Sequence, residues 1–334
     1  MAKSPAETGE ERLIAKYFRP LARNRGALGL LDDAAVLTPP TSCDLVVTTD
    51  AIVAGIHFFA DDPPDAIARK ALRVNLSDLA AKGAKPSGFL LALALPDRIA
   101  PSWLKAFAKA LDADAQAYDC PLLGGDTVKT RGPVVVSVTA LGTLPQGSMV
   151  QRNGAKVGDR VFVTGTIGDA ALGLKLRRDS RAARRWKLET KMQRHLADRY
   201  LLPQPRNAVA DVLRKFASAA MDVSDGLAGD LNKLCRASGV SAEIDTLRVP
   251  LSPAARAALK AEPALIKTIL TGGDDYEVVC TIPPVNLSTF RAAATVTGVS
   301  VMEIGRIVVG KSGARFLGAN GRPLSLKILS YSHF

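Results

Sequence analysis

The strongest constraint on the fold is the alternation of strand-like and helix-like segments in each half of the chain. In the first half, β-branched and apolar runs predict strands over 45–49, 89–95 and 133–141, and helical spacing of apolar residues predicts helices over 64–82 and 102–117. In the second half, the same signals predict strands over 161–164, 241–244, 277–282 and 299–309, and helices over 169–176 and 227–234. The segments do not repeat as regular βαβ units, so they favour a mixed α/β (α+β) fold over a doubly wound sheet.

Length and composition indicate a globular chain with two domains. A chain of 334 residues suggests two domains of about 150 residues, and the turn-rich segment 142–147 is the best linker candidate, which divides the chain into 1–147 and 148–334. The longest apolar run, 89–95, is far shorter than the ~20 residues of a membrane-spanning helix. The charged N-terminus lacks the apolar core of a secretory signal. The four cysteines, at least 45 residues apart, predict neither a zinc knuckle nor a disulfide framework. We therefore expect a reduced, cytoplasmic protein.

The chain is basic, and much of its excess charge lies in one stretch. The formal net charge is +12, and residues 173–200 hold ten basic and three acidic residues. Such local charge is typical either of a nucleic-acid patch or of a solvated helical hairpin on an enzyme with anionic substrates. No aromatic ladder, zinc pattern or helix-turn-helix signature accompanies the stretch, so the hairpin is favoured and nucleic-acid binding is the weaker alternative.

Aspartates in short polar segments carry the chemistry that the sequence predicts. They are Asp32, Asp33, Asp50, Asp78, Asp126, Asp222, Asp225, Asp274 and Asp275. Taken singly, Asp33, Asp222 or Asp275 could be a helix cap or a surface charge. Taken together, hard oxygen ligands without His or Cys select Mg²⁺ or Mn²⁺, and dispersed carboxylates indicate a polyphosphate held through several ions. Because Asp222 and Asp225 are three apart, we also expect them on one face of a helical turn.

One motif match is misleading. Gly305–Ser312 fits the P-loop expression G-x-x-x-x-G-K-[ST], but its interior, Ile307–Val309, is β-branched and predicts a strand. With the strand-like piece 315–317 that follows, the segment predicts a β-meander with glycines at its turns. If ATP binds this chain, it binds without a Walker loop.

Several motifs in a fixed order resemble one family over almost the whole chain, from about residue 10 to 334. In order they are TTDAIVAGIHF, VNLSDLAAKGAKP, LLGGD, RNGAKVGD, VTGTIGDAALGL, MDVSDGL, TGGDDYE and the terminal YSHF. Together they resemble the thiamine-monophosphate kinase family of the aminoimidazole-ribonucleotide-synthetase-like superfamily. The resemblance implies an N-terminal metal- and ATP-binding domain that dimerises by joining sheets into a barrel, and a C-terminal α/β domain. It also implies transfer of the ATP γ-phosphate to thiamine monophosphate, which yields thiamine diphosphate.

The resemblance also implies roles for individual residues. The implied Mg²⁺ ligands are Asp33, Thr48, Thr49, Asp50, Asp78, Asp126, Asp222 and Asp225. The implied ATP contacts are Tyr118, Gly125, Asp126, Arg152 and Ser224, and the implied contacts to thiamine monophosphate are His57, Asp274 and Tyr331. No protein nucleophile is implied, because a substrate phosphate oxygen can attack in line once the charges are neutralised.

Two departures and several alternatives stay open at this point. Leu31 stands where the family usually has glycine, so the turn before Asp33 could be built differently, and Asp274 is one methylene shorter than the usual glutamate. His57 could instead be a capping imidazole and Tyr331 a packed terminal residue. A selenophosphate-synthetase-like or carbamoyl-dehydratase-like activity is the alternative within the superfamily. The former expects a reactive Cys near the N-terminus, where the first cysteine here is Cys43, and the latter expects a terminal Cys.

Overall fold

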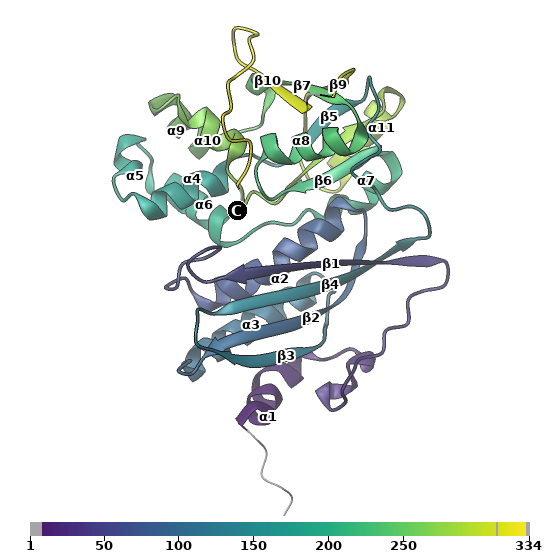
Figure 1. Ribbon diagram of the computed structural model, residues 1–334, viewed down its shortest axis with the longest axis vertical. Coiled ribbons are helices and arrows are strands. Elements are labelled where there is room, and N and C mark those ends of the chain that lie inside the picture. The colour runs from purple at the N-terminus through teal and green to yellow at the C-terminus, as the bar shows by residue number, and fades with distance from the viewer. Residues whose placement is uncertain (1–8, 312, 332–334) are drawn as a thin grey trace, which may run out of the picture. The chain divides into compact units, whose positions relative to one another are not determined.

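The computed structural model describes residues 9–311 and 313–331 (Figure 1). The chain forms two compact units. The first consists of the described residues up to Leu76 together with Pro86–Gln146, and the second of Ser77–Lys85 together with the described residues from Gly147 onward. No helix in the described ranges is long and apolar enough to cross a membrane, and all four cysteines are free.

The first unit is built on a four-stranded sheet in the order β1-β4-β2-β3. Its strands are β1 (Cys43–Val53), β2 (Lys85–Pro96), β3 (Leu122–Thr130) and β4 (Val135–Pro145). Its helices are α1 (Gly9–Leu13), α2 (Pro64–Ala81) and α3 (Pro101–Ala117), and short helical turns occupy Ile14–Phe18, Arg19–Leu21 and Arg25–Leu30. β1 and β4 are antiparallel, whereas β2 and β3 are parallel.

Helices cover only one face of this sheet. Figure 1 shows α2 and α3 on the same side of the strands, and their apolar residues, such as Leu72 and Phe107, are fully buried. Side chains alternate between the two faces of a strand, so Phe89 and Leu91 of β2 are buried whereas Leu90 is exposed. The opposite face of the sheet is therefore uncovered within this unit.

The second unit is built on a six-stranded sheet in the order β10-β7-β9-β5-β8-β6. Its strands are β5 (Arg160–Thr164), β6 (Ala219–Val223), β7 (Ser241–Asp245), β8 (Glu277–Ile282), β9 (Val301–Val308) and β10 (Gly313–Leu317). Its helices are α4 (Asp169–Arg178), α5 (Ala182–Arg185), α6 (Thr190–Leu201), α7 (Ala210–Phe216), α8 (Leu227–Ser238), α9 (Pro253–Ala261), α10 (Leu265–Thr271) and α11 (Leu287–Val296). Three-residue 3₁₀ turns lie at Asn207–Val209, Thr246–Arg248 and Pro284–Asn286.

Two apolar cores hold this second sheet between helices. One core joins the sheet to α4, α6, α8, α9 and α10, through residues such as Leu196, Leu231 and Ile269. The other joins it to α7 and α11, where Phe162 and Phe290 meet edge to face with ring centroids 5.1 Å apart. Because both faces are covered, β5, β6 and β8 are almost wholly buried, as their continuous apolar runs require.

The mixed α/β class is confirmed, and each predicted strand and helix has its counterpart. Three local features differ from the expectations. LLGGD lies inside β3, a strand that the sequence pattern did not predict. The linker candidate 142–147 is part of β4 as far as Pro145, and the two units divide after Gln146. The predicted meander fails because β7 inserts between β9 and β10, running antiparallel to the former and parallel to the latter. Within the P-loop match, Gly305–Val308 is strand, as expected.

Candidate functional site

The first unit gathers three of the predicted residues around one cavity. Asp33, Gly125 and Asp126 line a space of about 780 Å³ together with residues of the uncovered sheet face, among them Ser137 and Thr139. Asp33 and Asp126 are both exposed. The two carboxylates therefore face a solvent-filled hollow, where incoming cations can reach them without breaking an internal ion pair in this part of the chain.

Close packing of backbone against backbone fixes Asp126. β3 runs parallel to β2 with Asp126 in register with Ala92. At Gly125 the φ angle is +153°, and a Cβ there would overlap the carbonyl oxygen of Leu91. Only glycine fits this approach of the two strands. Gly125 of LLGGD thus serves strand packing, and it also leaves the backbone beside Asp126 bare.

The turn before Asp33 is built differently from a glycine turn, as Leu31 suggested. Leu31 itself has φ of −111°, and the left-handed conformations fall on Leu28, Gly29 and Leu30 instead, with φ of 49°, 65° and 54°. The Val36 amide donates to the Gly26 carbonyl at 2.8 Å and closes the loop. The Asp33 amide donates to the Asp32 carboxylate at 2.8 Å, which fixes the pair of acids relative to each other.

β1 divides its three predicted ligands between two faces. Thr49 donates to the Val138 carbonyl at 3.2 Å and accepts from the Thr139 hydroxyl at 3.0 Å. Thr139 lines the cavity, so Thr49 is tied to its wall. Because side chains alternate along a strand, Thr48 and Asp50 lie on the opposite face of β1.

Two further predicted contacts of the first unit do not line the cavity. His57 accepts a hydrogen bond from the Val53 amide at Nδ1 (3.0 Å), which places the proton of the neutral ring on Nε2. The alternative of a capping imidazole therefore holds for Nδ1. Tyr118 ends α3 and packs under the guanidinium of Arg73, 5.7 Å from the ring centroid. Neither residue lines the cavity with Gly125 and Asp126.

In the second unit, Asp222 and Asp225 occupy different kinds of structure. Asp222 is buried inside β6, and Asp225 lies in the loop after that strand. Gly226, with φ of 115° and ψ of 141°, delays the start of α8 until Leu227. The expectation that the two acids share one face of a helical turn is therefore wrong. Their carboxylates are presented by a strand end and by a loop.

Asp225 belongs to a small charge cluster that the sequence pattern did not reveal. Lys233 forms ion pairs with Asp225 and with the fully buried Asp230, the latter at 2.8 Å. Asp230 also accepts from the Asp225 amide at 2.9 Å. Burial raises the pKa of Asp230, although the Lys233 ammonium opposes the shift. Their spacing in α8, three residues apart, was the available signal.

Two backbone hydrogen bonds join the motif TGGDDYE to the end of β6 and the loop that carries Ser224 and Asp225. The Asp274 amide donates to the Ser224 carbonyl at 2.8 Å, and the Tyr276 amide donates to the Val223 carbonyl at 2.9 Å. Asp274 and Tyr276 have left-handed backbones, with φ of 73° and 49°. Such conformations cost of order 1–2 kcal/mol outside glycine and mark constrained sites. This turn, residues 273–276, presents the predicted substrate contact Asp274.

Asp275, between those two residues, has a structural role. It is fully buried, and its carboxylate accepts from the Gly168 and Ala170 amides at 2.7 and 3.3 Å, at the start of α4. Burial raises its pKa well above the ordinary value, and the neighbouring charge of Asp169 adds to the shift. The helix-cap alternative that the sequence left open for Asp275 therefore describes it well.

A cationic group that sequence reasoning missed lies with two predicted ligands. Lys82, just after α2, donates to the Ala220 carbonyl at 2.7 Å. Burial and the nearby guanidinium of Arg152 lower the pKa of Lys82 to about 8, while the charges of Asp222 and Asp78 act in the opposite direction. The structure thus brings the predicted residues Asp78, Arg152 and Asp222 into one electrostatic environment. A lysine closing an apolar helix immediately before glycine was its only sequence signal.

The C-terminal segment lies against α8 and the loop that carries Asp225. The Tyr331 amide donates to the Asp225 carbonyl at 3.1 Å, and its side chain is half exposed. The segment lies directly on α8, because a Cβ at Gly229 would overlap Ser330. Ser332–Phe334, the rest of the terminal motif, lie outside the described residues.

The donor set fits a magnesium site. All eight predicted ligands offer carboxylate, hydroxyl or carbonyl oxygen, the atoms that Mg²⁺ prefers. Across residues 9–311 and 313–331, no three His, Cys, Asp or Glu side chains converge into a ready-made metal site. Mg²⁺ is usually held by one or two carboxylates and completed by water and phosphate, so separated acids suit ions that arrive with a polyphosphate.

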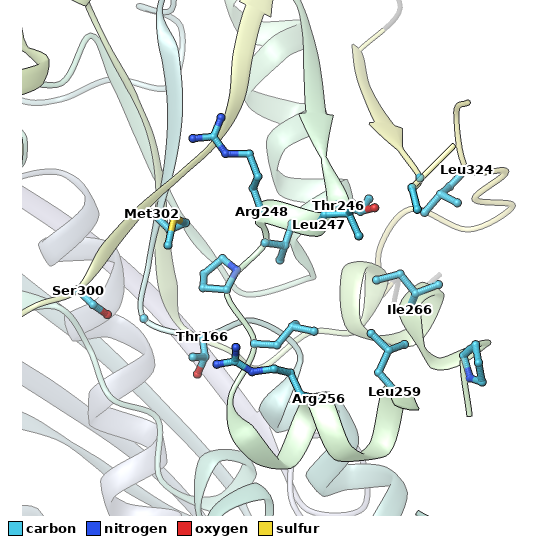
Figure 2. A pocket seen from close by; sticks show the side chains of 17 residues that line it. Thr166, Thr246, Leu247, Arg248, Arg256, Leu259, Ile266, Ser300, Met302 and Leu324 are labelled. Carbon is cyan, nitrogen blue, oxygen red and sulfur yellow. The ribbon is translucent and has the colours of Figure 1, made fainter. Parts of the chain in front are cut away.

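A second cavity of the unit has a different character. This cavity of the second unit has a volume of about 820 Å³. Apolar side chains such as Leu259, Ile266 and Leu324 form most of its wall, and Arg248 and Arg256 are its charged members (Figure 2). Arg248 points away toward the Glu303 carboxylate, 3.8 Å distant. No acidic residue lines this cavity, so it offers no ligands for the metal-assisted chemistry predicted above.

Comparison with known proteins identifies the family. Residues 31–144 match the AIR synthase related protein N-terminal domain, and residues 156–318 match the corresponding C-terminal domain. A thiamine-monophosphate kinase from Caulobacter vibrioides is 44% identical over 96% of this chain and 89% of its own length.

Two solved structures of similar proteins extend the comparison. The thiamine-monophosphate kinase from Stenotrophomonas maltophilia K279a is 36% identical, covers 94% of this chain and 96% of its own, and has a TM-score of 0.81. The structure of AaThiL complexed with AMPPCP and TMP is 30% identical, covers 92% of this chain and 97% of its own, and has a TM-score of 0.75. With such identity over nearly the full length, this chain belongs to the thiamine-monophosphate kinase family.

Proposed function

We propose that this protein transfers the γ-phosphoryl group of ATP to the phosphate of thiamine monophosphate, which yields thiamine diphosphate and ADP. The observation that carries the proposal is full-length similarity to a protein solved with AMPPCP and TMP. The cavity of the first unit, which Asp33 and Asp126 line, and the loop of the second unit that carries Ser224 and Asp225 each offer oxygen atoms of the kind that such a reaction uses. We propose that the reaction takes place in the cytoplasm, where the four free cysteines would stay reduced.

The proposed site residues fall into groups that would together bind ATP and thiamine monophosphate. Bare backbone at Gly125 allows close approach of a phosphate, and Arg152 and Ser224 supply a planar cation and a hydroxyl to it. Asp33, Thr48, Thr49, Asp50, Asp78, Asp126, Asp222 and Asp225 are the proposed Mg²⁺ ligands. Bound Mg²⁺ would neutralise charge on the phosphate oxygens. Lys82, whose pKa responds to the charges of Asp78 and Asp222, adds a further cation beside these two proposed ligands.

No covalent intermediate is needed. A phosphate oxygen of the acceptor is already a nucleophile, so catalysis consists of alignment and charge neutralisation. Three of the four cysteines offer no reactive alternative, because burial raises the pKa of Cys120, Cys235 and Cys280 to about 12. His57, Asp274 and Tyr331 are the proposed contacts to thiamine monophosphate, where the Tyr331 ring suits a cationic thiazolium.

We further propose that the protein works as a homodimer joined through the first unit. The uncovered face of its sheet exposes Leu45 and Val47 of β1, Leu90 of β2 and Val128 of β3. A contiguous apolar sheet face is typical of an interface. Pairing of two such faces would bury these residues and enclose the cavity beside Asp126. Sedimentation analysis across a dilution series tests this, and a monomer at all concentrations would contradict it.

The reaction is tested with purified protein, Mg²⁺ and ATP. Thiamine monophosphate should be converted to thiamine diphosphate with one ADP per product. Free thiamine should be a poor acceptor, because the site is expected to hold the phosphate of the acceptor. Absence of product from the monophosphate, or efficient pyrophosphorylation of free thiamine, would refute the proposal.

A further inference from the structure

An arginine of the basic stretch is buried behind the turn that presents Asp274. Arg199 lies near the end of α6, and only 9% of its side chain is exposed. Its Nη2 donates to the Asp275 carbonyl at 2.9 Å and to the Glu277 carboxylate at 2.9 Å. The guanidinium therefore bridges the turn, residues 273–276, to the first residue of β8.

Several contacts hold Glu277, the residue at one end of this bridge. Glu277 is fully buried and in register with Val223, the last residue of β6. Its carboxylate accepts from the Thr164 hydroxyl at 2.7 Å and from Arg206 Nε at 2.6 Å. Arg199 thus joins the turn 273–276 to a buried carboxylate that is held by several further contacts.

The part of the motif that Arg199 holds is the strained part. Asp275 lies between the two left-handed residues Asp274 and Tyr276, and its side chain is already committed to the start of α4. A backbone of this kind persists only where its surroundings over-determine it. The Arg199 side chain of α6 constrains this turn through its hydrogen bond to the Asp275 carbonyl.

We propose that Arg199 is a positioning residue: it holds the 273–276 turn in the conformation that directs Asp274 toward the acceptor substrate. The inference rests on the proposed function, since it assumes that Asp274 contacts thiamine monophosphate. It assigns to one member of the 173–200 stretch a role that its exposed neighbours do not share. Arg199 itself touches no substrate.

A matched pair of variants separates positioning from simple stabilisation. Arg199→Gln and Arg206→Gln each remove one cation from the Glu277 carboxylate, so both should lower the melting temperature. Only Arg199→Gln removes the hydrogen bond to the Asp275 carbonyl. We expect it to raise KM for thiamine monophosphate about tenfold or more, with KM for ATP changed less than about twofold. Arg206→Gln should leave both KM values near those of the wild type, and Arg199→Lys should restore part of the loss.

Hydrogen exchange gives a readout that does not depend on activity. The Asp274 and Tyr276 amides, which donate to the Ser224 and Val223 carbonyls, should exchange faster in Arg199→Gln than in Arg206→Gln. Equal exchange and equal KM changes in both variants would overturn the inference, as would faster exchange with an unchanged KM for thiamine monophosphate. If the wild type transfers no phosphoryl group, the proposed function fails, whereas the exchange comparison still decides whether Arg199 holds the turn.

Discussion

Two sets of acidic residues differ in what they are bonded to. Around the open cavity of the first unit, Asp33 and Asp126 are exposed. In the second unit, Asp169, Asp230, Asp275 and Glu277 are buried, and each accepts hydrogen bonds from backbone amides, hydroxyls or cations of its own unit. The first unit has a buried acid of the same kind, Asp114, which is held by Arg73. The same residue type thus serves as an available ligand at the open cavity and as a structural anchor where it is buried and paired.

The difference has an energetic meaning. An exposed carboxylate beside other carboxylates is repelled until a cation arrives, so its charge weakens the metal-free fold. A buried carboxylate held by cations is costly to leave unmatched, so removing its charge weakens the fold at once. Substitution of an acid by its amide should therefore affect activity at the open cavity and stability at the buried, paired anchors.

The largest expected effect is on stability in the second region. Glu277→Gln would leave the buried Arg199 and the half-buried Arg206 without their shared counter-charge. Breaking a buried ion pair from one side costs about 3–5 kcal/mol, so we expect a loss of that order in the free energy of unfolding, measured by urea denaturation.

An exposed glutamate of the same unit serves as the control for Glu277. Glu262 also accepts from an arginine, Arg185 Nε at 3.0 Å, and from Trp186 Nε1 at 2.8 Å, but at the surface. Glu262→Gln should lower stability much less, because exposed pairs are screened by solvent. Equal losses in the two variants would remove the distinction between anchors and surface charges.

The next largest effect is on turnover in the first region. Asp126→Asn keeps the shape of the side chain and removes a proposed Mg²⁺ ligand, so turnover should fall by a factor on the order of 10² or more, and the Mg²⁺ concentration needed for half-maximal rate should rise. The melting temperature without nucleotide should stay equal or increase.

Asp97→Asn is the matched control for Asp126, since Asp97 is an exposed acid of the same unit that pairs with Lys129 at 3.0 Å. Its turnover should be close to that of the wild type. A normal Mg²⁺ response in Asp126→Asn would show that the open cavity does not hold the metal.

A smaller effect is expected from the exposed part of the basic stretch. Reversal of Arg181, Arg184 and Arg185 to Glu should leave turnover within about threefold, because exposed charges couple weakly at physiological salt. Arg185 also loses its pairs with Asp179 and Glu262, so the melting temperature should drop slightly. Nucleic-acid binding by the wild type should be weak and steeply salt-dependent. Tight binding at high salt that the reversal abolishes would support the nucleic-acid alternative.

The smallest expected effect is a pH dependence of stability that arises from His195. Its Nε2 lies 3.0 Å from Oδ2 of the buried Asp169. Asp169 raises the pKa of His195 above its ordinary value of 6.5, burial and the charge of Arg199 oppose this, and Asp198 adds to it. Protonated His195 therefore stabilises the fold below the unfolded pKa, and this contribution is lost as pH rises through the folded value. The difference in melting temperature between wild type and His195→Gln should shrink from pH 6 to pH 9. A constant difference would contradict it.

The sequence predicted those features that local pattern determines. Strand and helix periods were sufficient for most strands of the two sheets, although β3 and β6 were not predicted, and motif order was sufficient for the family. Strand order depends on long-range pairing, so the insertion of β7 between β9 and β10 could not be read from adjacent segments. The roles of Asp275, Glu277 and Arg199 depend on burial created by distant elements, and a basic run of residues gives no sign that one member points inward. The assignments of individual ligands and substrate contacts stay predictions.

The contact of the Tyr331 amide with the Asp225 carbonyl has a practical consequence. Gly229 accommodates Ser330 only because it has no side chain. A side chain at position 229 would therefore push the segment 330–331 off α8 and weaken the hydrogen bond to the loop that carries a proposed metal ligand. A change within α8, at a residue that is itself no proposed ligand, can thus disturb that loop from outside.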